Sequence, residues 1–435
     1  MHVLGSRKRK PYSTGSQTPF RASDARPVTG VDNSGVNSKL TAILHPYVLT
    51  PRILGWLKSD SGQIIFFVAF TRIVLLCIGI LAHVVQTHPD VWDLDLSRAV
   101  LKEAIQPFSY ADVSWYMDIA FNGYTEKPFS TVNEQVNWAF FPLWPLILRI
   151  LRMFSSHIIL AGMTLSTLLF GLAALCLYKL LLLDVDVEIA KSATLFLILF
   201  PSAYFTLRPG PEGLFVLLVI GAFLTARTHH WYWAGILAGL ATLARLQGVL
   251  LLLPLLYIYY RQYKASHLHQ IGGLSLLLIP LSLLGFMAHI YHLSGNLFAI
   301  FLIQGEWDNQ LTFPFRYIAL YLYEPKILDY YGLDLVIISI PFIILAIIIT
   351  IRMLFDQDIP REYVIYSLCS LFLIVARNNT NGSLRYMLPV FPFYFVFARL
   401  VRSHKWLFRC ALFVFLVLQI FYFIAFMRSY SWALT

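Results

Sequence analysis

The chain alternates between long apolar runs and short polar segments over most of its length. The first clear run covers about 63–85, and a polar and aromatic segment follows it from 86 to 137. Further apolar runs lie near 157–182, 190–206, 213–227, 231–245, 247–260, 271–293, 334–354, 362–377, 386–401 and 406–427. Because a helix needs ~20 mostly apolar residues to cross a bilayer, this pattern predicts an all-α polytopic membrane protein with about 10–11 transmembrane helices.

The apolar run at 138–154 differs from the others. It is short, contains Pro142 and Pro145, and carries Arg149 and Arg152 near its end. We interpret it as a half-inserted or surface helix, because counting it as a span would reverse the orientation of every later segment. The eleven-span solution then puts the carboxyl terminus outside.

The composition is typical of an integral membrane protein. Hydrophobic residues make up 58% of the chain and charged residues 13%, whereas soluble domains have about 45–50% and ~25%. The net charge of +10 comes from the amino terminus and from short segments between apolar runs. That pattern is typical of cytoplasmic loops and argues against a nucleic-acid partner. The four cysteines have no paired spacing, so we expect no disulfide.

The amino-terminal segment differs from the rest of the chain. A basic tetrad from Arg7 to Lys10 is followed by a Ser/Thr/Gly/Pro-rich stretch up to about Asn37, which we expect to be disordered. No apolar signal-peptide region follows the basic start. We therefore expect residues 1–60 to be a basic cytoplasmic segment and residues 61–435 to form a single transmembrane domain.

Lysine and arginine in the short loops predict the orientation of the spans. Basic clusters recur along the chain, at 1–58, around Arg227, at 261–269, from Arg352 to Arg361 and from Arg399 to Arg409. If these clusters are cytoplasmic, the intervening loops are external: a long first loop at 86–156, turns at 207–212, 245–247 and 378–385, and a late loop at 294–333.

The first external loop carries a candidate catalytic group. If its central part forms a short helix, Asp112, Trp115 and Tyr116 share one face by their i, i+3, i+4 spacing. Aromatic rings can stack on a pyranose and exclude water, and a carboxylate among them can take a proton from an attacking hydroxyl. The alternative is structural, since Ser109 followed three residues later by Asp112 is a capping-box pattern.

Arg208 and Glu212 flank a Pro-Gly-Pro turn in the second external loop. They could bind a phosphate and an acceptor hydroxyl respectively, or they could pair with each other and close the turn. Arg245 interrupts an apolar stretch, where an arginine is costly unless it faces water, a partner or an anion.

Two further polar clusters lie in the late loops. One contains Gln304 and Trp307, and the other runs from Arg377 to Arg385 and Tyr386. Each cluster alone is typical of a solvated loop. Their common placement on the external side favours one shared site.

Arg72 lies in the middle of the first span, so it needs a partner, a cavity or a lipid phosphate. A structural partner and a functional one are both open. The histidines show no metal-ligand spacing. Carboxylates that could hold a divalent metal exist, but no ligand spacing identifies such a site, so the sequence indicates no cofactor and leaves a divalent metal open.

The order of these motifs resembles the PIG-V-type mannosyltransferases, which add the second mannose to glycosylphosphatidylinositol (GPI) and belong to the GT-C superfamily. The resemblance covers about 63–432 and depends on the order of the motifs rather than on any one of them. It is carried by Arg72 and by the segments 112–124, 139–145, 201–215, 245–248, 304–307, 385–392 and 426–432.

The resemblance implies a GT-C-type helical bundle with a helical first external loop and an active site on the external or lumenal face. It implies a polyprenyl-phosphate sugar as donor, a lipid or glycan as acceptor, and contact with membrane lipids. Asp112 becomes the expected base and Glu212 a second acidic candidate. We expect substrate-binding roles for Arg72, Trp115, Tyr116, Arg208, Arg245, Gln304, Trp307, Arg385 and Tyr386, whose arginines could stabilise the leaving phosphate.

The chain departs from the family at two places. Tyr110 and Ala111 precede the aspartate where the family has an aromatic residue and often an arginine, and Pro-Glu212-Gly replaces the usual Ser-Glu-Ser/Ala. Because several features of the eukaryotic enzymes are absent, we expect a bacterial relative in the plasma membrane without a GPI substrate; a eukaryotic chain would lie in the endoplasmic reticulum membrane. Two other classes stay open, a lipid or glycan transporter and a non-catalytic membrane scaffold.

Overall fold

The computed structural model describes residues 58–87, 105–266, 271–307, 309–317, 323, 333–378 and 382–429. All of them lie in one compact unit, Trp56–Thr435. The prediction of a disordered, cytoplasmic amino-terminal segment lies almost wholly outside the described residues. So do the beginning of the first external loop and much of the late loop beyond residue 317.

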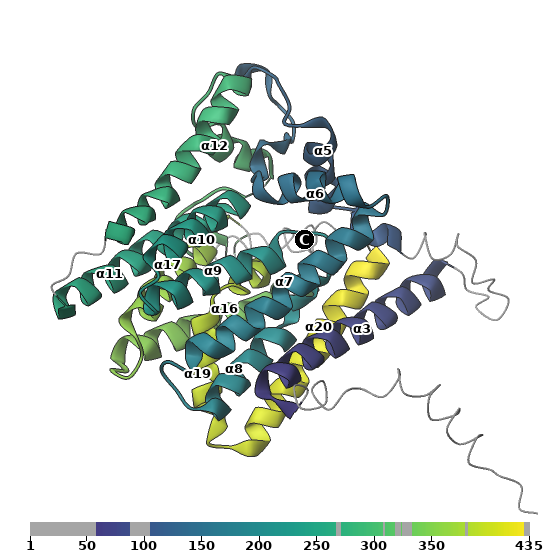
Figure 1. The fold of residues 1–435 in the computed structure, drawn as a ribbon. Helices are drawn as coiled ribbons and strands as arrows, with labels where there is room; N and C mark the ends of the chain where they lie inside the picture. Colours follow the sequence, from purple (N-terminus) through teal and green to yellow (C-terminus); the bar gives the residue numbers. More distant parts are fainter. Residues whose placement is uncertain are drawn as a thin grey trace, which may run out of the picture. The chain divides into compact units, whose positions relative to one another are not determined.

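The described chain is built of helices (Figure 1), so the predicted all-α class is confirmed. In chain order the helices are α3 (Asp60–Thr87), η3 (Gln106–Ser109), α5 (Asp112–Asn122), η4 (Phe129–Thr131), η5 (Asn137–Ala139), α6 (Leu143–Phe154), α7 (Ile158–Leu181), α8 (Val187–Leu199), η6 (Pro201–Leu207), α9 (Glu212–Arg227), α10 (Trp231–Ala244), η7 (Leu246–Leu251), α11 (Leu252–Ser266), η8 (Ile271–Leu277), α12 (Leu278–Ser294), α13 (Ala299–Leu302), η9 (Ile303–Trp307), α16 (Leu333–Phe355), α17 (Arg361–Val375), α18 (Ser383–Met387), α19 (Phe391–Arg402) and α20 (Lys405–Ser429).

The protein is an integral, multi-pass membrane protein. Among the described residues, four helical segments are long and apolar enough to cross a bilayer: Asp60–Val85, Ile158–Leu181, Ile271–Ser294 and Lys405–Met427. A fifth span results if α8 and η6, which are bent by 71° at their junction, count as one. This number is below the expected ten or eleven, because other predicted runs form shorter helices. For example, α9 has 16 residues and α10 has 14.

Close backbone contacts hold the central helices together. Figure 1 shows α7, α9 and α10 side by side, and α3 beside α20, in agreement with their residue contacts. A Cβ atom at Gly213 of α9 would overlap the Ser166 carbonyl of α7, and one at Gly79 of α3 would overlap the Phe423 ring of α20. Small residues at such points let helix backbones approach closely, which is how helices commonly associate in membranes.

The junction between α8 and η6 is a break that two distant side chains stabilise. Pro201 follows it and cannot donate a backbone hydrogen bond. The guanidinium of Arg72, from α3, donates to the carbonyls of Ile198 and Ala203 at 2.8 and 3.0 Å. Gln419, from α20, donates to the carbonyls of Ile198 and Phe200, both at 3.1 Å. Arg72 is thus a structural partner of the break, which leads the chain into the turn before α9.

The run predicted to be a half-inserted or surface helix forms α6, which has 12 residues and is too short to cross a bilayer. Leu146, Ile150 and Met153 are exposed along it. Arg149, which is also exposed, donates to the carbonyl of Ala120, near the end of α5, at 2.9 Å. Helix α6 therefore presents an apolar face outward and supports the helix that carries Asp112.

A group of ion pairs lies at the carboxyl-terminal end of α9. Arg227 contacts Asp184 at 2.6 Å and Glu362 at 3.3 Å, and Arg261 contacts Glu362 at 3.0 Å. Glu362 is fully buried. These contacts join the turn between α7 and α8 to α9, α11 and α17, and they use the basic residues predicted to face the cytoplasm.

We predict that Arg72→Met destabilises the protein, because the two hydrogen bonds that its guanidinium donates across the break, to the Ile198 and Ala203 carbonyls, are lost. A hydrogen bond from a charged group contributes about 1.5–3 kcal/mol. The measurement is thermal unfolding of the purified protein in detergent. The control is Arg152→Met, which removes an exposed guanidinium that stacks on the Phe121 ring at 4.4 Å. Equal melting temperatures for the two variants would contradict the role given to Arg72.

Candidate active site

Helix α5 begins with Asp112, after a backbone turn that is rare for a non-glycine residue. Ala111 precedes it with φ of 55°, and such conformations persist only where the surrounding structure imposes them. The Ser109 hydroxyl donates to the Gln106 carbonyl at 2.7 Å, and no side chain caps the helix. The capping-box alternative is therefore not the arrangement that forms. The Asp112 carboxylate instead faces Arg385.

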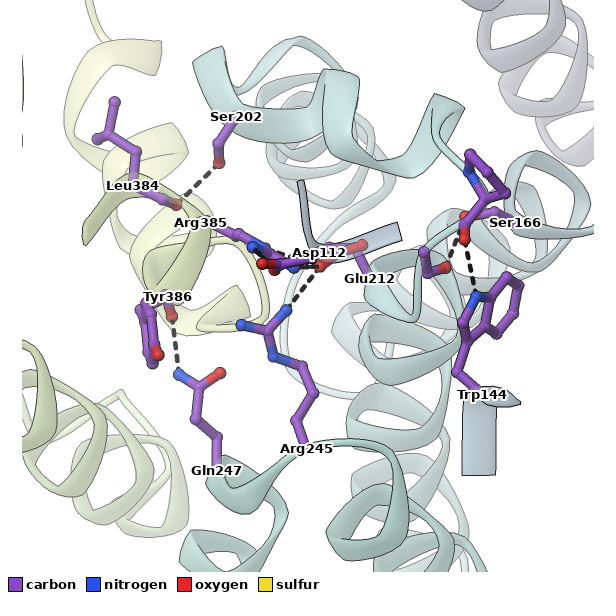
Figure 2. Close-up of polar contacts among 12 residues, drawn as sticks. Asp112, Trp144, Ser166, Ser202, Glu212, Arg245, Gln247, Leu384, Arg385 and Tyr386 are labelled. Atoms are coloured by element: carbon purple, nitrogen blue, oxygen red, sulfur yellow. Dashed lines mark hydrogen bonds and ion pairs between the residues drawn. The ribbon is translucent and has the colours of Figure 1, made fainter. Parts of the chain in front are cut away.

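Glu212 begins helix α9, after a turn that other helices hold in place. Trp144 donates to the Pro209 carbonyl at 2.8 Å and Ser166 donates to the Gly210 carbonyl at 3.3 Å (Figure 2). A Cβ atom at Gly210 would overlap the Glu212 carboxylate, so a larger residue there would displace that carboxylate. Asp112 and Glu212 thus both occupy the first position of a helix, where the helix dipole stabilises negative charge.

Arg385 bridges the two carboxylates. It pairs with Asp112 through Nη1 and with Glu212 through Nη2, and its Nε donates to Glu212 Oε1 at 2.7 Å. Arg245 approaches the same Glu212 oxygen at 2.6 Å. Figure 2 shows the four side chains converging from α5, α9, α18 and the end of α10. We call Asp112, Glu212, Arg245 and Arg385 the charge cluster; its two negative and two positive groups balance.

Arg208 does not close the turn with Glu212 as one alternative predicted. Its Nη2 donates to the carbonyl of Tyr110 at 3.0 Å, and its guanidinium stacks on the Phe426 ring at 4.5 Å. Arg208 is 2% exposed. It therefore holds the residue before Ala111, and so supports the strained turn that orients Asp112.

The arginines keep Asp112 ionised. Burial acts to raise the pKa of Asp112. The charge and hydrogen bond of Arg385, together with the charges of Arg208 and Arg245, have the larger opposite effect, so the pKa of Asp112 lies below its ordinary value. Asp112 keeps partial access to solvent, with 24% of its side chain exposed. It is consequently an accessible carboxylate at neutral pH.

A cavity of about 820 Å³ opens beside the charge cluster. This volume lies within the range of small-ligand sites. Eight of the predicted site residues line it, namely Asp112, Trp115, Tyr116, Arg245, Gln304, Trp307, Arg385 and Tyr386. Glu212, Arg208 and Arg72 are not among the lining residues, so the predicted set divides into a cavity wall and a supporting layer behind it.

One wall of the cavity is aromatic. Trp115 and Phe140 stack with their ring planes 9° apart, and Trp307 meets both rings edge-on with centroids 5.0 and 5.1 Å away. Trp115 comes from the first external loop and Trp307 from the late loop, so the two predicted loops meet here. Such rings offer a platform for the apolar face of a sugar.

Another wall is polar, and sequence reasoning missed much of it. Arg377 donates to Asn309 Oδ1 at 2.7 Å, and Asn309 donates to Gln304 at 2.9 Å and to the Tyr386 hydroxyl at 3.2 Å. Gln247 also lines the cavity. Arg377 opens the polar segment singled out above, whereas Asn309 and Gln247 are neutral amides whose type alone carries no signal of a site.

No group of three or more His, Cys, Asp or Glu side chains that could hold a metal ion occurs in the part of the chain that the structure describes. Both carboxylates of the charge cluster pair with arginines. Arginines therefore compensate the negative charge of both carboxylates.

An ionised carboxylate, two arginines and an aromatic wall around one cavity in a membrane protein suit transfer of a sugar from a phosphate-bearing donor. The family model for glycosyltransferase family 87 matches residues 138–376, which is more than half of the chain. The chain therefore belongs to glycosyltransferase family 87, and it is a membrane glycosyltransferase.

Two solved structures of archaeal oligosaccharyltransferases are similar to this chain. One is the Archaeoglobus fulgidus oligosaccharyltransferase with Zn and sulfate, at 13% identity and a TM-score of 0.40, covering 81% of this chain and 53% of that one. The other is the oligosaccharyltransferase AglB from the same organism with an inhibitory peptide and a dolichol-phosphate, at 13% identity and a TM-score of 0.37, covering 83% and 56%. The chain thus spans about half their length, and at this similarity neither defines its substrate. No curated protein matches the chain.

We predict a pH-dependent stability from Asp112. Because its pKa is lowered in the folded protein, its contribution to stability is present above the ordinary Asp pKa of about 3.9 and is lost as the pH falls through the lowered value. The melting temperatures of the wild type and of Asp112→Asn should therefore differ at neutral pH and converge as the pH falls below about 4. A gap that stays constant with pH would contradict the lowered pKa.

Proposed function

We propose that the protein transfers a sugar, most specifically mannose, from a polyprenyl-phosphate donor to a hydroxyl group of a lipid or glycan acceptor. The observation that carries this proposal is the cavity in which Asp112, Arg245 and Arg385 lie beside the aromatic wall. The resemblance to the PIG-V-type enzymes supports mannose and a polyprenyl-phosphate donor. Family 87 membership supports glycosyl transfer in general.

The chemistry assigns one role to each group. The acceptor oxygen forms a bond to the anomeric carbon, and the bond from that carbon to the phosphate oxygen breaks. The phosphate leaves with the bonding electrons, and Arg385 and Arg245 stabilise its developing charge. Asp112, ionised and partly exposed, takes the proton that the acceptor hydroxyl loses. Trp115 and Trp307 hold the sugar ring and exclude water.

Glu212 acts in this proposal as a positioning residue. It is 4% exposed and does not line the cavity, but it binds both Arg245 and Arg385. When a donor phosphate replaces Asp112 as the partner of Arg385, Glu212 still holds both guanidinium groups. The release of Asp112 from its ion pair raises its basicity at the moment a proton acceptor is needed.

The charge cluster is proposed to face the external or lumenal side. Its members come from segments predicted to be external, whereas Arg227 and Arg261, from predicted cytoplasmic segments, gather around Glu362 at the other end of α9. We propose a cytoplasmic amino terminus and a bacterial plasma membrane. The acceptor we propose is not GPI.

The two alternative classes have less support. A transporter commonly places charges near the bilayer midplane, but the mid-span Arg72 is engaged by the carbonyls of the helix break. A non-catalytic scaffold would explain why the chain departs from the family at Pro-Glu212-Gly, yet Gly213 is needed where α9 packs against Ser166 of α7. That departure from the family therefore has a packing explanation and leaves the acidic group in place.

The test of this function is transfer by the reconstituted protein. Radiolabelled polyprenyl-phosphate mannose and polyprenyl-phosphate glucose are each incubated with it and with host lipid extract, and the labelled product is identified. Labelled product from the mannosyl donor supports the full proposal. Product from the glucosyl donor alone overturns mannose, and no product from either donor overturns the function.

We predict that Asp112→Asn lowers kcat by about 10²- to 10⁴-fold, the usual contribution of a general base. Binding of polyprenyl phosphate should persist, because Arg385 keeps its bonds to Glu212. The matched control is Asp118→Asn, the same change on the same helix; Asp118 accepts a hydrogen bond from Asn137 and does not line the cavity. Retained transfer by Asp112→Asn would remove Asp112 from the mechanism.

We predict a different kinetic effect for Glu212→Gln. Loss of the charge that anchors Arg245 and Arg385 should raise KM for the donor by about tenfold or more, while kcat falls less and keeps its pH profile. Glu212→Asp should restore part of the affinity. A loss of kcat at unchanged KM, with an altered pH profile, would instead make Glu212 the base.

A further inference from the structure

Gln247 sits on the cavity wall beside the phosphate-binding arginines. Helix α10 ends before Arg245, and the chain turns tightly into η7, where a Cβ atom at Gly248 would overlap the backbone of Thr242. This close approach brings Gln247 to the cavity together with Arg245. Gln247 is 6% exposed, so its amide is more than nine-tenths buried.

The contacts of Gln247 determine which way its amide faces. Its Nε2 donates to the backbone carbonyl of Tyr386 at 3.4 Å. Because a carbonyl oxygen only accepts hydrogen bonds, the nitrogen must be the atom turned towards Tyr386. Figure 2 shows the amide oxygen on the opposite side, away from Tyr386. This oxygen, Oε1, is buried and has no hydrogen-bond partner among the described residues.

A buried acceptor without a partner is costly, and at a ligand cavity it indicates a hydrogen-bond donor on the ligand. The phosphodiester of a glycosyl donor cannot supply that donor, because it carries no proton at neutral pH and its oxygens only accept hydrogen bonds. A sugar hydroxyl can. Arg245 lies two residues before Gln247, and Tyr386 contacts both residues, through its ring and its carbonyl respectively. All of these residues and Arg385 line the same cavity, so a sugar whose phosphate binds Arg245 and Arg385 occupies the cavity that Gln247 lines.

We propose that Gln247 is a specificity-determining residue that accepts a hydrogen bond from one hydroxyl group of the donor sugar. This proposal rests on the proposed function, because it takes the donor phosphate to bind at Arg245 and Arg385. Gln247 then recognises the sugar, whereas Arg245 and Arg385 bind the phosphate. Sites built to bond a hydroxyl reject analogues that lack it, so Gln247 selects among sugars.

The test is a cycle of protein and ligand changes. Wild type and Gln247→Met, in lipid nanodiscs, are titrated with short-chain polyprenyl phosphate, its mannosyl ester and the four esters of monodeoxy mannose. The wild type should bind one deoxy ester about 10- to 100-fold more weakly than the mannosyl ester. Gln247→Met should bind the mannosyl ester more weakly than the wild type does by that same factor. It should bind the one affected deoxy ester as tightly as the wild type does. Sugar-free polyprenyl phosphate should bind both proteins equally.

The controls separate this proposal from a structural role and from the proposed function. Gln106→Met replaces an exposed glutamine away from the cavity and should leave all affinities unchanged. Weaker binding of sugar-free polyprenyl phosphate to Gln247→Met would show that Gln247 only positions Tyr386 and Arg385, and would overturn the proposal. The proposal is also overturned if, for every deoxy ester, the loss of affinity from Gln247→Met and the loss from the missing hydroxyl simply add. If the wild type binds no polyprenyl phosphate and transfers no sugar, both proposals are overturned. If it transfers sugar but Gln247→Met and the removal of a hydroxyl show no coupling, only the role of Gln247 is overturned. If Gln247→Met does not fold, Gln247→Leu replaces it.

Discussion

The ion bridge that Arg385 makes between Asp112 and Glu212 is the constraint on which the site depends. Asp112 lies 273 positions before Arg385 in the chain, and Glu212 lies 173 positions before it. The bridge joins the start of α5, the start of α9 and α18, and Arg245 adds the end of α10 through Glu212. Because Glu212 and Arg385 are buried and the charges balance, loss of one member leaves a buried charge uncompensated, which is far costlier than loss of an exposed pair.

The hydrophobic pattern predicts the helical elements well where a run is long and uninterrupted. The runs at 157–182 and 406–427 correspond closely to α7 (Ile158–Leu181) and α20 (Lys405–Ser429). The run at 190–206 was predicted as one span, but it is broken beside Pro201 and bent by 71°. Hydropathy cannot show this break, because what stabilises it is Arg72 and Gln419 from helices distant in sequence.

The sequence predicts the segments of the site better than the contacts within it. Asp112, Arg245 and Arg385 stood out because charges are rare in this chain, and they do converge. The partner of Glu212 was expected to be the nearby Arg208 in one alternative, and the structure gives Glu212 two distant arginines instead. Periodicity reports a local environment, whereas pairing depends on how the bundle closes. For the same reason, Gln247 gains significance only from its orphaned oxygen.

The length of helix α9 sets the distance between two polar layers. Glu212 begins it in the charge cluster, and Arg227 ends it among Asp184 and Glu362. Its 16 residues, at ~1.5 Å each, separate the layers by about 24 Å. An insertion or deletion of one residue would turn one end by ~100° relative to the other and break one of the two sets of ion pairs. The length of α9 is therefore set by electrostatics at both ends, although its interior is simply apolar.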